Sequence, residues 1–117
     1  MSAAVIVAIG VLGGIGAIAR VLLDAAICRR TRGRFPLGIL VVNVSGAFAL
    51  GLLVGAAAGD DTQRLLGSGL LGAYTTFSTW MLDSHRLGAR LGALNVVLGL
   101  ALGIAAVWLG RELAMAM

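Results

Sequence analysis

Charged residues are scarce in this sequence, as are the residue types that most often carry catalytic or redox chemistry. Only 12% of its 117 residues are charged and 60% are hydrophobic, whereas a soluble domain carries about 25% charged residues. The single cysteine, Cys28, has no partner within the chain for a disulfide, and His85 is the single histidine. This composition favours an integral membrane protein, and it gives no support to hydrolytic or redox catalysis, so we expect no enzyme activity.

Four apolar stretches predict an all-α membrane protein. The pattern lacks the alternation of strands, and helices satisfy their own backbone hydrogen bonds in lipid. Each stretch approaches the roughly 20 helical residues that cross a bilayer core. We expect residues 1–117 to form one transmembrane domain of four helices, with spans at about 3–23, 37–58, 65–82 and 91–109.

No lysine occurs, and the nine arginines are distributed unevenly along the chain. The first and third connections, with the end of the first span, hold seven: Arg20, Arg29, Arg30, Arg32, Arg34, Arg86 and Arg90. The other side holds only Arg64 and Arg111. Because cytoplasmic loops carry the excess of basic residues, we expect both termini outside the cytoplasm and insertion in one orientation. This role accounts for the net charge without a nucleic-acid partner.

Carboxylates are absent from the middle of every predicted span. All five lie at span ends or in connections: Asp24, Asp60, Asp61, Asp83 and Glu112. A proton-coupled transporter needs a titratable group inside the membrane. The sequence therefore argues against a small four-helix drug or cation antiporter, although the size and the number of spans would fit one.

Uncharged polar residues do occur inside the spans, most densely in the third. Residues 74–80 hold four hydroxyls and three aromatic rings: Tyr74, Thr75, Thr76, Phe77, Ser78, Thr79 and Trp80. In a continuous helix, Thr75, Ser78 and Thr79 share one face. Hydroxyls and the amide of Asn43 in the second span can donate to an anion, and aromatic ring edges carry positive charge. These groups suit a passage for a small anion that binds weakly enough to leave, although any one of them can instead link helices.

Four motifs resemble those of the Fluc (CrcB) family of fluoride ion channels, and the resemblance covers nearly the whole chain. They are GGIGAIAR at 13–20, PLGILVVNVSGAFALG at 36–51, GAYTTFSTW at 72–80 and AVWLG at 106–110. The resemblance implies passive export of fluoride through the cell inner membrane of a bacterium, which limits fluoride toxicity. It also implies an antiparallel dimer in lipid, with two pores along the interface and a third helix broken near its middle.

The resemblance also implies roles for individual residues. A structural sodium ion at the dimer interface would be held by backbone carbonyls of Gly72 and Thr75. The pore and its anion would be contacted by Asn43, Phe77, Ser78, Thr79 and Trp80.

Three residues depart from the family pattern at positions expected to face the pore. They are Ile39 in place of threonine, Trp80 in place of phenylalanine, and Gly99 in place of a hydroxyl residue. An antiparallel homodimer requires each copy to insert both ways, which the arginine bias opposes. We therefore expect pairing with a homologous subunit of opposite orientation. An alternative is a non-conducting subunit that only completes its partner's pore.

Overall fold

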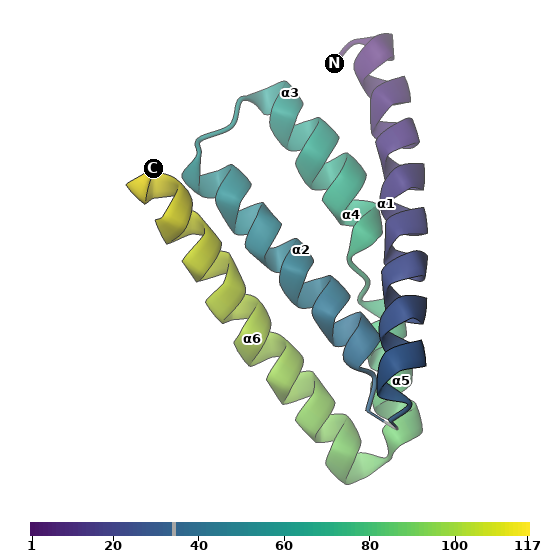
Figure 1. Ribbon diagram of the computed structural model, residues 1–117. Helices are drawn as coiled ribbons and strands as arrows, with labels where there is room; N and C mark the ends of the chain where they lie inside the picture. Colours follow the sequence, from purple (N-terminus) through teal and green to yellow (C-terminus); the bar gives the residue numbers. More distant parts are fainter. Residues whose placement is uncertain (34) are drawn as a thin grey trace.

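The computed structural model describes residues 1–33 and 35–117, so that Arg34, counted above with the cytoplasmic arginines, lies outside the described residues. All regular elements in the described part are helical (Figure 1). In chain order they are α1 (Ala3–Thr31), α2 (Leu37–Gly55), α3 (Asp60–Thr62), the π-helical stretch η1 (Gln63–Leu71), α4 (Gly72–Tyr74), α5 (Ser78–Leu87) and α6 (Ala89–Ala116).

Three of these helices, α1, α2 and α6, are long and apolar enough to cross a membrane. Helix α1 continues past the predicted span end at residue 23, and α6 extends beyond both predicted ends, 91 and 109. The apolar stretch measures only the part suited to hydrocarbon, whereas a helix continues through arginine, which is a good helix former. With 29 residues, α1 is roughly 43 Å long.

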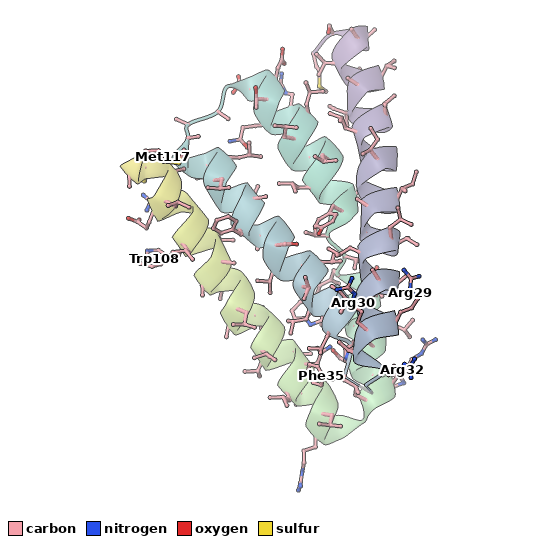
Figure 2. All side chains as sticks on the ribbon, viewed as in Figure 1. Arg29, Arg30, Arg32, Phe35, Trp108 and Met117 are labelled. Carbon is pink, nitrogen blue, oxygen red and sulfur yellow. The ribbon has the colours of Figure 1, made fainter. Side chains whose placement is uncertain are left out.

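The chain termini and the first and third connections lie at opposite ends of the bundle. Figure 1 shows both termini at one end, with the α1–α2 connection and the α5–α6 turn at the other. The first and third connections therefore share one side, as predicted. Figure 2 shows Arg29, Arg30 and Arg32 around the end of α1, far from Met117 at the end of α6. These three arginines therefore lie at the end of the bundle opposite the termini (Figure 2).

Helices α2 and α6 pack closely because glycines replace side chains along their contact. A Cβ atom at Gly51 would collide with the carbonyl oxygen of Val107, and one at Gly110 with that of Phe48. Small residues of this kind let helix backbones approach in a membrane. Helix α1 approaches η1 in the same way, with Gly16 against the Leu70 carbonyl.

The third predicted span, residues 65–82, is made of short segments rather than one long helix. The α-helical conformation gives way to a π-helix at Gln63, and at Thr75 the backbone is extended, with φ −78° and ψ 158°. Regular helix resumes at Ser78. Gly88 then turns the chain into α6 with φ 88°, a backbone region that glycine adopts readily.

Candidate functional site

A cavity of about 350 Å³ lies beside the interruption between α4 and α5. Residues from α2, η1, α4 and α5 and from the non-helical stretch line it, and all of the lining residues are uncharged. They are Asn43, Gly46, Ala47, Leu50, Gly67, Leu71, Gly72, Thr75, Thr76, Phe77 and Trp80. The sequence motif at 36–51 and the one at 72–80 therefore meet at a single place in the fold.

Asn43 joins α2 to the interruption through both ends of its amide. Its Nδ2 donates to the Thr76 carbonyl at 2.9 Å, and its Oδ1 accepts from the Thr76 amide at 2.8 Å. Because these partners are a fixed donor and a fixed acceptor, they decide which way the amide faces. An asparagine Nδ2 carries two hydrogens. The bond to Thr76 uses one of them, and Asn43 lines the cavity.

This pairing releases a carbonyl of the preceding turn. In a continuous helix the Thr76 amide would donate to the carbonyl of Gly72, but here it donates to Asn43. Within 1–33 and 35–117, no backbone amide donates to the carbonyl of Gly72 or of Thr75. Carbonyls freed where a membrane helix unwinds are suited to coordinate a cation such as Na⁺.

The hydroxyls around the interruption are largely bonded to the backbone. Thr75 Oγ1 donates to the Leu71 carbonyl at 2.9 Å, and Thr76 Oγ1 accepts from the Thr79 amide at 3.2 Å. The second bond pairs an amide that the irregular backbone would otherwise leave unpaired in lipid, whereas the Leu71 carbonyl also accepts from the Thr75 amide at 3.0 Å. The helical spacing that placed Thr75 on one face with Ser78 and Thr79 does not apply, because the backbone between them is not helical.

A closed set of hydrogen bonds fixes α5 against α6. Asn95, only 1% exposed, donates through Nδ2 to Ser84 Oγ at 2.9 Å. Ser84 Oγ donates to the Trp80 carbonyl at 2.8 Å, and the Trp80 indole Nε1 donates back to the Asn95 carbonyl at 3.3 Å. The position of the half-buried Trp80 is therefore set from both its backbone and its ring.

The family model for the CrcB-like protein, Camphor Resistance (CrcB), matches residues 7–111 of this chain. The chain belongs to the CrcB family. It is 46% identical to fluoride-specific ion channel FluC 2 of Mycolicibacterium paratuberculosis, over 95% of this chain and 94% of that relative. It is 45% identical to fluoride-specific ion channel FluC 1 of Symbiobacterium thermophilum, over 92% and 94%. Because this CrcB chain has three helices that are long and apolar enough to cross a membrane, it is a multi-pass membrane protein.

The cavity of this CrcB chain brings together most of the residues singled out in the sequence, but not all of them. Asn43, Phe77, Trp80, Gly72 and Thr75 line it. The remaining two, Ser78 and Thr79, begin α5 outside its lining, where Ser78 is exposed. Phe77 is 69% exposed and meets the Trp80 ring edge to face, with centroids 5.9 Å apart.

The structure gives each of the three departures from the family pattern a surrounding that the sequence did not predict. Ile39 is only 3% exposed and does not line the cavity. The prediction that it faces a pore is therefore wrong, because α2 turns this side chain into the core. A Cβ at Gly99 would lie 2.8 Å from atoms of the Trp80 indole. The glycine at 99 and the tryptophan at 80 are thus in direct contact.

Two cavity residues with clear structural roles were given no site role from the sequence. Thr76 supplies the backbone groups that Asn43 binds, and Gly46 leaves room for the Tyr74 ring and the Thr75 methyl group. The available signal was spacing: Gly46 follows Asn43 by three positions and so shares its helix face. No spacing rule identifies Thr76, because its partner lies 33 residues away.

Proposed function

We propose that this chain is a subunit of a fluoride channel that lets fluoride leave the cytoplasm passively. Membership of the CrcB family and relatives named fluoride-specific ion channels support this function. The observation that carries it is the cavity in which Asn43, Phe77 and Trp80 meet without any carboxylate or arginine in the lining. Uncharged donors bind a small anion without trapping it.

The residues of the cavity have distinct parts in this proposal. The second Nδ2 hydrogen of Asn43 donates to fluoride, and the edge of the Phe77 ring presents its positive hydrogens. Ser78 and Thr79, at the start of α5, continue the series of donors beyond the cavity. No bond is made or broken, so the chain conducts and does not catalyse.

A structural sodium ion is the second element of the proposal. The carbonyls of Gly72 and Thr75 would hold it, and their lack of backbone partners among the described residues fits this role. The ion would compensate carbonyl dipoles that an interrupted helix leaves in the membrane.

An antiparallel dimer is the third element, and the large exposed area of Phe77 supports it. An exposed aromatic ring beside a cavity that offers hydrogen-bond donors is better covered by a second subunit than by lipid, since the partner completes the wall of the path. The bias of seven arginines against two favours a separate homologue inserted in the opposite direction. The arginine-rich end would then face the cytoplasm of the inner membrane.

A flux experiment tests the proposal directly. Liposomes containing the purified chain, alone and then with an oppositely biased homologue, are assayed for fluoride and chloride efflux. We expect fluoride efflux without chloride efflux in the second sample only. Fluoride efflux from the chain alone would contradict the need for a separate partner. Chloride efflux from either sample, or no fluoride efflux from both samples, would contradict the channel assignment.

The replacement Phe77→Ile then tests the path itself. It should abolish fluoride efflux while leaving dimer assembly intact, because the aliphatic side chain fills space but has no positive edge. Unchanged efflux from Phe77→Ile would show that fluoride does not pass this ring. It would favour the alternative that this chain only completes the pore of its partner.

A further inference from the structure

Trp80 lies between two hollows of different character. On one side is the cavity with Asn43 and Phe77. On the other is a hollow of about 470 Å³ along α6, whose lining includes Gly99, Gly103 and Ile104 and carries almost no polar group. Both hollows are mainly apolar, and the indole lines both, but only the first offers the hydrogen-bond donors of Asn43 and the threonines.

The indole fits there only because residue 99 has no side chain. Three ring atoms, Cε2, Cζ2 and Nε1, would each lie 2.8 Å from a Cβ at Gly99, closer than carbon atoms in contact normally approach. The ring has little freedom to withdraw, because its Nε1 is bound to the Asn95 carbonyl and its backbone to Ser84. Gly103, one turn further along α6, has nothing within 4 Å of its Cβ position.

The Trp80 ring contacts the Phe77 ring and so affects where the Phe77 ring lies. The two rings meet at an interplanar angle of 84°, the edge-to-face arrangement that aromatic pairs favour. Phe77 precedes α5 and is otherwise exposed. A displaced indole would therefore displace the ring that borders the cavity.

We propose that Gly99 and Trp80 form one size-matched unit that positions the aromatic wall of the anion path. Gly99 touches no anion and acts as a positioning residue, through the indole. This inference rests on the proposed channel function, and it assigns the path in this subunit to the Asn43 side of Trp80. The two departures from the family pattern are then a single compensated exchange and not two separate losses.

Tryptophan fluorescence tests the contact without relying on conduction. The chain has two tryptophans, so Trp108→Phe leaves Trp80 as the single reporter. In that background, Gly99→Ala should shift the emission of Trp80 and increase its quenching by acrylamide. Gly103→Ala should change neither. An unchanged spectrum for Gly99→Ala, or an equal change for Gly103→Ala, would overturn the size match.

Fluoride efflux from the assembled channel tests the functional consequence. We expect Gly99→Ala to lower efflux about tenfold or more, as overpacking of a fixed ring implies, and Gly103→Ala to leave it unchanged. Adding Trp80→Phe to Gly99→Ala should restore most of the efflux, because the smaller ring accommodates the methyl group. If the double variant remains as impaired as Gly99→Ala, the proposal is wrong.

Two further outcomes separate this proposal from the channel function. If Gly99→Ala does not assemble, recovery of assembly by Trp80→Phe supports the unit, and no recovery overturns it. If the unmodified channel conducts no fluoride, the channel function fails, while the fluorescence result still decides whether the two residues are matched.

Discussion

The pair α2–α6 and the segment α4–α5 differ in the regularity of their backbones and in what holds those backbones in place. Helices α2 and α6 stay regular, and glycines bring their backbones into contact. The segment from Gly72 to Leu87 is interrupted at Thr75, and side chains accept from two of the backbone amides there, those of Thr76 and Thr79. In a membrane an irregular backbone is tolerated only where such groups are satisfied or line a cavity.

The two regions therefore contribute differently: the regular pair mainly stabilises the fold, and the interrupted segment mainly forms the cavity. The regular pair contains Val42, which is completely buried, and Ala106, which is nearly so. The interrupted segment contributes most of the polar lining of the cavity. Changes in the first region should therefore reduce the amount of folded protein, and changes in the second should reduce conduction by protein that remains folded.

The largest effect is expected from breaking the regular pair. Gly51→Ala forces a methyl group against the Val107 carbonyl, and moving two backbones apart should cost about 3 kcal/mol. The measurement is the temperature at which the detergent-solubilised protein loses its monodisperse size-exclusion peak. Gly10→Ala is the control, because nothing lies within 4 Å of that position. Equal melting of the two variants would show that the close approach is unimportant.

A smaller loss of stability, but a complete loss of conduction, is expected from Asn43→Ala. It leaves the Thr76 amide and carbonyl without their partner, at a cost of about 2 kcal/mol, and lets the interruption rearrange. The measurement is fluoride efflux relative to the amount of folded protein. Thr76→Ser is the matched control, since it keeps both backbone bonds to Asn43 and the hydroxyl that accepts from the Thr79 amide, and removes only a methyl group. Similar loss of efflux in both variants would contradict the role given to Asn43.

The smallest effect is expected from two surface ion pairs, one that precedes the interrupted segment and one in the regular pair. Arg64 contacts Asp61 at 3.2 Å before the interrupted segment, and Arg111 contacts Glu112 at 2.7 Å on α6. Both pairs are about half exposed, so Arg64→Gln and Arg111→Gln should each change stability by about 0.5 kcal/mol or less. A large shift in the melting temperature of only one variant would show that the regions also differ at their ends.

The elements that follow from composition and pattern were predictable without the fold. Apolar stretches located α1, α2 and α6, and the first and third connections lie at one end of the bundle, as predicted (Figure 1). Motif resemblance located the cavity residues Asn43, Phe77 and Trp80. Helix ends were less predictable, as for α6, because helix propensity continues where hydropathy stops.

By itself, the sequence determined a membrane protein with uncharged polar groups in its interior and a strongly biased distribution of arginine. Only the tertiary structure decided that Ile39 belongs to the core, that Asn43 holds the backbone of Thr76, and that Gly99 makes room for Trp80. The physical reason is that hydropathy and charge act on each residue according to its surroundings in lipid or water. Hydrogen bonds and steric fit instead depend on two residues that the fold brings together from distant parts of the chain.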